Sequence, residues 1–335
     1  QKEMTTPVVM LRMNDDERNR HGVVPSTPQG DDPLTAWDEA RARHPLERAE
    51  DGTWVVHGHP ETLRVLHDPA TFSSAVSAHP AIPAGMDPPE HGPWRALVDR
   101  YFTPEHVASL EPTFRSVAAE LIDAAKGRER AEAMGDLGEP FAVRAQCAFM
   151  GWPAELERAL TDWQDANRRA TRARDRIATA EVAAEFERRV VSVLEARRAA
   201  DATGDDVTGR LLRETIDGRP LNDDQIVAIV RTWTVGELGS IAAAVGIVVH
   251  ALSVAPELQS RLRAQPAMIP VAVDEILRAR GPLVANRRVA TRDVELAGCP
   301  VRKGDRLRIL WPSADRDARV FPEPDRVRLD RPPED

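Results

Sequence analysis

Two pairs of polar side chains have a spacing that could direct both members toward one partner. Glu275 and Arg278 stand at positions i and i+3, and His91 and Arg95 stand at i and i+4. On a helix, either spacing places both side chains on one face. The first pair can present a carboxylate and a guanidinium together. The second pair carries two donors and suits an anion.

The two cysteines lie where a metal ligand is not expected. Cys147 falls in the apolar run 145–149, which predicts a small hydrophobe in a core helix, and Cys299 follows Gly298 in a predicted turn. The sequence has no CxxC spacing, so neither a disulfide framework nor a structural zinc site is supported. It also has no Rossmann fingerprint and no P-loop, so a nucleotide site is not predicted.

The composition narrows the class of protein and its partners. The 335 residues are 42% hydrophobic, which is enough for a sizeable core. Lys and Arg number 45 against 54 Asp and Glu, a net charge of −9 with interspersed signs, so nucleic acid is not an expected partner. The longest apolar segment is interrupted by charges, and no membrane span or secretion signal is predicted. A reducing cytoplasm is the simplest location.

Helical periodicity dominates the elements that would position these residues. Helices are predicted over residues 33–43, 60–66, 103–125 and 222–253, together with a charged helix over 168–198 whose buried side carries Ile177, Val182, Phe186, Val190, Val191 and Leu194. Strands are predicted over residues 53–57, 287–290, 294–296 and 306–310, and a loop over 72–86. The expected fold is one mainly α domain with a minor β part.

The N-terminus is expected to lie outside that domain. Residues 1–20 are predicted to be a flexible extension, with Met4 a candidate native start, so residues 1–3 carry no weight in the fold prediction. The single domain is assigned to residues 21–335.

Four segments together resemble a cytochrome P-450: Asp87-Pro88-Pro89-Glu90-His91 with Arg95, Val235-Gly236-Glu237-Leu238-Gly239-Ser240, Glu275-Ile276-Leu277-Arg278, and Phe321-Pro322-Glu323-Pro324-Asp325-Arg326. The resemblance implies the mainly α fold of that family. The family's next landmark, the haem-cysteine loop F-x-x-G-x-x-x-C-x-G, is not among these residues. Two interpretations follow: a C-terminally truncated P-450 domain, or the fold without the metal chemistry.

The resemblance assigns roles to the polar pairs. It implies haem b as the cofactor, with its propionates held by His91, Arg95 and Arg288. It also implies that Glu275, Arg278 and Arg326 form a buried structural triad that holds the approach to the haem loop.

The central helix departs from the family pattern. The family usually has an acid followed by Thr, which relay protons to bound dioxygen. Counting back from Glu275 by 275 − 240 = 35 residues places Ser240 at the alcohol and Gly239 at the acid. Glu237 is then the nearby carboxylate, either a proton donor through water or a salt-bridging residue. Gly236 and Gly239 would let the helix open and leave room for a diatomic ligand.

The function implied is a haem-thiolate monooxygenase that inserts one oxygen atom of O2 into a small, mainly apolar substrate, using a ferredoxin-type electron donor. The family's substrate-facing segments match residues 72–86, 153–189, 234–240 and 282–286, so Leu283 and Val284 are candidate pocket residues. The alternative is a haem-free relative that binds and activates a partner enzyme such as a glycosyltransferase.

Overall fold

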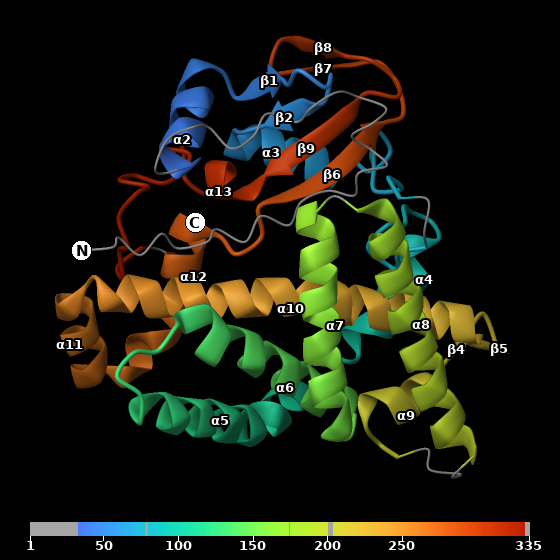
Figure 1. The fold of residues 1–335 in the computed structure, drawn as a ribbon. Helices are drawn as coiled ribbons and strands as arrows, with labels where there is room; N and C mark the ends of the chain where they lie inside the picture. Colours follow the sequence, from blue (N-terminus) through green and yellow to red (C-terminus); the bar gives the residue numbers. More distant parts are fainter. Residues whose placement is uncertain (1–32, 78–79, 174, 200–203, 332–335) are drawn as a thin grey trace.

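The long helix α10 (Asp223–Ser253) runs through the middle of the molecule, with a sheet on one side and helices on the other (Figure 1). The computed structural model describes residues 33–77, 80–173, 175–199 and 204–331. The predicted extension over residues 1–20 lies outside the described residues. The mainly α architecture with a minor β part confirms the predicted fold class.

The helices pack around α10 as a layered body. The others, in chain order, are α2 (Pro33–Arg43), α3 (His59–His67), α4 (His91–Asp99), α5 (Pro104–Lys126), the π-helix η1 (Ala133–Gly138), α6 (Glu139–Met150), α7 (Glu155–Ala173), α8 (Arg176–Ala199), α9 (Val207–Leu211), α11 (Pro256–Ala264), the 3-10 helix η2 (Pro266–Met268), α12 (Ile269–Arg280) and α13 (Trp311–Ala314). Direct contacts join α10 to η1, α6, α8 and α12. These contacts account for its apolar composition, which by length and composition alone would suit a membrane span.

Close packing against α10 depends on a glycine in η1. A Cβ added at Gly138 would lie 2.6 Å from the backbone oxygen of Ala242, which is closer than real Cβ atoms come to a neighbour. The N-terminus of α10 is fixed by a capping box in which Asn222 and Gln225 exchange side-chain to backbone hydrogen bonds of 2.9 and 3.0 Å.

The central sheet has the strand order β1-β2-β9-β6-β3. Its strands are β1 (Leu46–Arg48), β2 (Trp54–Val56), β9 (Arg306–Leu310), β6 (Ala285–Ala290) and β3 (Phe72–Ser73). Only β2 and β9 pair in parallel among these neighbours. One face buries an apolar cluster that includes Val56, Phe72, Leu307 and Ile309. Two hairpins complete the described strands: β4 (Thr215–Ile216) with β5 (Arg219–Pro220), and β7 (Val294–Leu296) with β8 (Cys299–Val301).

Four local predictions were wrong. The charged helix predicted over 168–198 is divided between α7 and α8. Ile177 is 73% exposed because it lies in the first turn of α8, before the buried seam that begins at Val182 and continues to Phe186, which packs on Trp163. Cys299 begins strand β8, and residues 297–298, both with positive φ, make the turn. The predicted loop over 72–86 begins with strand β3.

Two isoleucines provide a matched test of this packing. Ile229 on α10 is fully buried at 0% exposure, whereas Ile177 is 73% exposed. We expect Ile229→Ala to lower the free energy of unfolding by about 2–5 kcal/mol, because it leaves a cavity in the core. Ile177→Ala should change it by less than about 0.5 kcal/mol. Urea denaturation of the two variants measures both values, and equal losses would contradict the burial of Ile229 in the core.

Candidate functional site

A buried carboxylate, Glu275 on α12, is held by two guanidiniums. Arg278 binds it with two nitrogens, Nε at 2.7 Å from Oε2 and Nη2 at 3.0 Å from Oε1. Arg331 donates from Nε to Oε1 at 3.0 Å, and the backbone N–H of Arg328 donates to the same oxygen at 3.0 Å. The side chains of Glu275 and Arg331 are each 6% exposed. The predicted pairing of Glu275 with Arg278 is therefore present.

The third member of this cluster is not Arg326, as the sequence predicted. The Arg326 side chain is 68% exposed and pairs with Glu323 at 2.5 Å. The chain turns here, since the Arg326 N–H donates to the Glu323 oxygen, and the turn directs the Arg326 guanidinium outward. Arg326 contributes only its backbone oxygen, which accepts from Arg278 Nη2 at 3.3 Å. Arg331, five residues later, supplies the guanidinium instead.

The electrostatics of the cluster favour the charged carboxylate. Burial alone would raise the pKa of Glu275, but the hydrogen bonds from Arg278, Arg328 and Arg331 outweigh burial and hold the pKa below its usual value of 4.5. The folded state thus binds this proton less readily than the unfolded chain does. The resulting stability is present above pH 4.5 and is lost as the pH falls through the lowered pKa.

Arg278 also fixes the chain that follows α13. Its Nη1 donates to the backbone oxygens of Asp315 and Pro324, at 2.7 and 3.0 Å. The ring of Phe321 lies under the same guanidinium, with 5.2 Å between the ring centroid and Cζ. One side chain on α12 thereby sets the path of residues 315–326.

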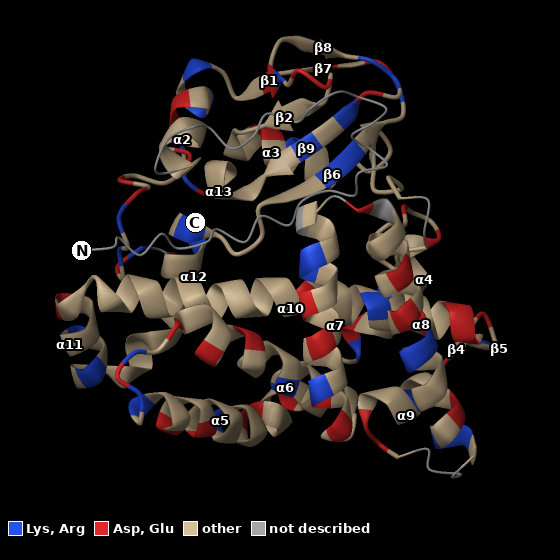
Figure 2. Cartoon of the chain, in the orientation of Figure 1, with Lys and Arg blue, Asp and Glu red and all other residues tan. Residues whose placement is uncertain are grey.

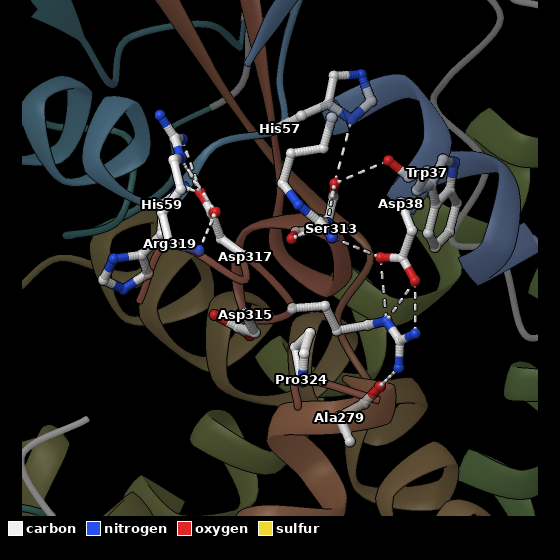
Figure 3. A network of polar contacts seen from close by, with 12 residues as sticks. Trp37, Asp38, His57, His59, Ala279, Ser313, Asp315, Asp317, Arg319 and Pro324 are labelled. Atoms are coloured by element: carbon white, nitrogen blue, oxygen red, sulfur yellow. Dashed lines mark hydrogen bonds and ion pairs between the residues drawn. The ribbon is translucent and has the colours of Figure 1, made fainter. Parts of the chain in front are cut away.

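A second ionic network joins α2 to the segment after α13, and its members were not predicted (Figure 3). Arg316 donates to both carboxylate oxygens of Asp38, with Nη2 at 2.5 Å from Oδ2, and its Nη1 reaches the backbone oxygen of Ala279 at 3.4 Å. Arg41 donates to Asp38 at 2.8 Å and to the backbone oxygen of Ser313 at 2.6 Å. No local spacing signals these contacts, because the partners are up to 278 positions apart.

In the same region, the side chains of Glu47, His57 and Ser313 form a chain of consecutive polar contacts. His57 Nε2 lies 3.1 Å from Glu47 Oε1, and His57 Nδ1 lies 3.2 Å from Ser313 Oγ. This order resembles a nucleophilic triad. However, His57 is 1% and Ser313 0% exposed, and the Ser313 hydroxyl oxygen already accepts from Arg41 at 3.0 Å. These contacts therefore hold α2 against the sheet and offer no nucleophile to a substrate.

Arg288 on β6 is a half-buried cation. Its Nη1 donates to the backbone oxygen of Arg287 at 2.8 Å, and it forms no ion pair with any residue that the structure describes. Burial lowers the pKa of Arg288, and the Asp87 carboxylate opposes that effect only partly. A guanidinium in this setting would be stabilised by an additional anion, so the donor fits a carboxylate such as a haem propionate.

The start of α4 is attached to the same edge of the sheet. Asp87 accepts hydrogen bonds from Ser73 Oγ and from the backbone N–H of Ser74, and β3 pairs with β6 at Ser73 and Val289. The backbone N–H of His91 in turn donates to the Asp87 backbone oxygen at 3.0 Å. Asp87 thus binds the half-buried His91 through its backbone oxygen and β3 through its carboxylate, and β3 pairs with the strand that carries Arg288.

Arg95 is directed elsewhere. It shares a face of α4 with His91, but it is 58% exposed and pairs with Asp99 at 2.7 Å, one helical turn further along. The expected three-way convergence is therefore incomplete in this structure. Asp99 competes with the expected anion for the Arg95 guanidinium, and the spacing of His91 and Arg95 does not reveal this competition.

The middle of α10 has an open face. Gly236 and Glu237 are exposed and Ser240 is half-buried, whereas Leu238 is 2% exposed on the opposite side. A Cβ at Gly236 would meet no atom within 4 Å. The Ser240 hydroxyl donates to the Glu237 backbone oxygen at 3.0 Å, with Glu237 Oε2 at 3.3 Å. Glu237 forms no ion pair with a described residue, so the salt-bridge interpretation finds no partner in that part of the chain.

Neither cysteine is suited to bind a metal. Cys147 on α6 is 1% exposed, and burial, with a smaller effect from Glu157, raises the pKa of its thiol to about 12. Cys299 lies in the β7–β8 hairpin. Within the described ranges, no group of three His, Cys, Asp or Glu residues could hold a metal ion.

The predicted pocket residues Leu283 and Val284 lie half-buried between α12 and β6. The Val284 backbone oxygen accepts from the Trp311 N–H at 3.1 Å. A separate apolar hollow lies between α7 and α8, and most of its lining falls in the predicted substrate-facing range 153–189. It is lined by Trp152, Leu156, Ala159, Leu160, Phe186, Arg189, Val190 and Val193.

Comparisons with known proteins agree with this architecture. The sequence model of the family "Cytochrome P450" matches residues 257–335. A probable cytochrome P450 127A1 from Sinorhizobium fredii is 32% identical over 295 residues, which cover 84% of this chain and 68% of the relative. The erythromycin C-12 hydroxylase of Saccharopolyspora erythraea is 30% identical over 298 residues, which cover 85% and 74%.

Solved structures show the same fold. The open form of the cytochrome P450 EryK from S. erythraea superposes with a TM-score of 0.81 at 27% identity, covering 92% of this chain and 81% of that one. CYP109E1 from Bacillus megaterium in complex with corticosterone gives 0.81 at 26% identity, covering 90% and 81%. The chain therefore has the fold of a class of oxidoreductases that act as monooxygenases. It belongs to the cytochrome P450 family.

The buried cluster contains Arg331 in place of the predicted Arg326, and this difference can be tested. Arg331→Ala should lower the free energy of unfolding by about 3 kcal/mol, because it removes one partner of a buried carboxylate. Arg326→Ala removes only an exposed pair and should cost less than about 1 kcal/mol. Chemical denaturation at pH 7 checks both, and the difference should shrink at acid pH as Glu275 becomes protonated. A larger loss of unfolding free energy for Arg326→Ala than for Arg331→Ala would support the original prediction that Arg326 belongs to the cluster.

Proposed function

We propose that this protein is a haem-dependent monooxygenase of small, mainly apolar organic substrates. The proposal includes haem b as cofactor, O2 as co-substrate, a ferredoxin-type protein as electron donor and the cytoplasm as location. The observation that carries the proposal is Arg288, a half-buried cation on β6 that suits an anionic group. The names of the relatives, which include a mycinamicin IV hydroxylase/epoxidase, support oxygenation as the reaction.

Three side chains are proposed to hold the haem propionates. Arg288 would bind one directly, His91 would bind from the start of α4, and Arg95 would join after exchanging its Asp99 partner. Bound haem supplies the redox chemistry for oxygen activation. The chemistry of this donor set fits carboxylates, whereas the thiols of Cys147 and Cys299 do not fit as ligands to iron.

The open face of α10 is proposed to serve proton delivery. Ser240 Oγ holds its proton toward Glu237, within hydrogen-bond distance of both the backbone oxygen and Oε2. Glu237 is exposed and can exchange protons with water. A proton could therefore pass from solvent to the Glu237 carboxylate, which would stand in for the acid missing at Gly239. Glu237 would then donate this proton to Ser240 Oγ as Ser240 turns and passes its own hydroxyl proton onward.

Substrate binding is proposed for the space between this face and the start of β6. Gly236 leaves room beside α10, since its missing Cβ has no neighbour within 4 Å. Leu283 and Val284 would provide apolar contacts from the segment that joins α12 to β6. Apolar walls with few polar groups are typical of pockets for small organic ligands.

The propionate assignment is tested by comparing arginines. In haem-loaded protein, Arg288→Ala should weaken haem binding by about 10-fold or more, because a charge-assisted hydrogen bond is worth roughly 1.5–3 kcal/mol. Arg158→Ala, at a side chain that is 92% exposed on α7, should leave haem binding unchanged. Transfer of haem to apomyoglobin, followed by absorbance, measures the retention of each variant. Equal retention would remove Arg288 from the haem site.

The proton route is tested by the yield of product per reductant consumed. Glu237→Gln should slow product formation, and Ser240→Ala should divert reducing equivalents to hydrogen peroxide. General acid assistance typically contributes about 10²–10⁴-fold, so a true relay gives a large change. A purely structural Glu237 would alter stability and leave this yield constant. An unchanged yield in both variants would mean that protons arrive by another route.

A further inference from the structure

The only tyrosine in the chain, Tyr101, lies against a tryptophan of α10. Tyr101 follows α4, and its ring centroid is 5.2 Å from that of Trp233, with the two ring planes tilted by 53°. Both side chains are removed from water, at 0% and 5% exposure. Phenol and indole are the aromatic side chains that give up one electron most readily. The contact therefore joins two oxidisable groups inside the protein.

The other aromatic neighbours of Trp233 are phenylalanines. Phe102 and Phe149 pack edge-on against the Trp233 ring, with centroids 5.4 and 5.9 Å away. Phe102, which is 48% exposed, also stacks on Phe149. A benzene ring is much harder to oxidise than a phenol or an indole. Among these three ring neighbours, Tyr101 is therefore the one that can supply an electron to Trp233.

The Tyr101 hydroxyl has a proton acceptor in place. It donates to Glu214 Oε1 at 2.9 Å, while Arg100 Nη2 lies 2.6 Å from Glu214 Oε2. Burial, and then the hydrogen bond with Glu214, raise the pKa of Tyr101, so the hydroxyl keeps its proton in the resting protein. A phenol that loses an electron becomes a strong acid, and a carboxylate at hydrogen-bond distance can take its proton directly.

The charges around the two rings differ. Arg210 Cζ lies 4.4 Å from the centroid of the Tyr101 ring, and this positive charge would repel a ring that became cationic. Oxidation of Tyr101 therefore requires release of its proton to Glu214. By contrast, most of α10 carries neither acidic nor basic residues, as Figure 2 shows. Trp233 lies in this apolar helix, and the proton acceptor lies at Tyr101.

We propose that Trp233 and Tyr101 form an electron relay that removes unused oxidising equivalents from the open face of α10. Trp233 lies one helical turn before Glu237 and gives one electron to an oxidant at that face. Tyr101 then gives one electron to Trp233 and its hydroxyl proton to Glu214. The products are the oxidant reduced by one electron, neutral Trp233, a neutral tyrosyl radical and protonated Glu214.

The relay is reset by a reductant from solution. A small thiol or ascorbate supplies one hydrogen atom to the tyrosyl radical, and Glu214 returns its proton to water. The source of the oxidant rests on the proposed function, in which oxygen activation at the open face of α10 generates it. The transfer between the two rings does not rest on that function, because any strong one-electron oxidant beside Trp233 can start it.

The test places a chemical oxidant beside Trp233. Gly236→Cys, at a position on the next turn of α10 where a Cβ meets no atom within 4 Å, is labelled with a thiol-reactive ruthenium polypyridyl complex. The full chain also carries Cys299→Ala, and Cys147, at 1% exposure, stays unlabelled. Light and an external electron acceptor oxidise the ruthenium. Electron paramagnetic resonance of rapidly frozen samples should then show a tyrosyl radical, which only Tyr101 can form.

Three substitutions in this labelled chain separate the steps. Trp233→Phe should remove most of the tyrosyl signal, because the electron donor beside the label is lost. Glu214→Gln cannot take up the proton as a carboxylate does and should lower the radical yield by about 10-fold or more, since base assistance typically contributes about 10²–10⁴-fold. Trp163→Phe is the matched control, at a tryptophan that is 4% exposed, and should leave the yield unchanged.

Two results would overturn the relay: no tyrosyl signal in the labelled parent chain, or an equal signal in Trp233→Phe and in the control. If Trp233→Phe fails to fold, Glu214→Gln carries the test, because a full yield without the proton acceptor equally contradicts the proposal. In haem-loaded protein given reductant and O2 without substrate, Tyr101→Phe should lose its haem absorbance faster than the wild type. Equal rates, with the ruthenium result intact, would keep the relay and overturn its link to oxygen activation.

Discussion

The carboxylate of Glu275 is the constraint on which the rest of the structure depends. A charge removed from water costs several kcal/mol unless it is paired and its oxygens are hydrogen-bonded, so the surrounding chain has little freedom. Arg278 and Arg331 meet this demand from two different segments. Arg278 then uses its remaining nitrogen, Nη1, to bind two backbone oxygens, so the path of the chain after α13 follows from the need to neutralise one buried acid.

The proposed site inherits its geometry from this cluster. Helix α12, which carries Glu275, packs against α10 and leads directly through residues 281–284 into β6. Helix α12 therefore contacts the helix that carries Ser240 and leads into the strand that carries Arg288, so a shift of α12 would affect both elements.

Sequence reasoning succeeded where a residue's role depends on its immediate neighbours. The start of the helix predicted over 103–125 and the pairing of Glu275 with Arg278 were predictable from residues three apart, because the Thr103 side chain accepts from the His106 N–H and Arg278 binds Glu275. It failed where the decision lies with distant or competing partners. Nothing local shows that Arg331, rather than Arg326, returns to Glu275, or that Asp99 takes Arg95. The ion pair of Asp38 with Arg316 spans 278 positions and leaves no pattern to detect.

That ion pair has a consequence for how the protein is made. Helix α2 is among the first described elements to leave the ribosome, yet Arg316, which neutralises Asp38, is added 278 residues later. Synthesis proceeds at roughly 5–20 residues per second, so for about 14–56 seconds Asp38 has Arg41 but not Arg316 as an ionic partner. Docking of α2 onto the segment after α13 therefore comes late in folding, as expected for contacts that close long loops.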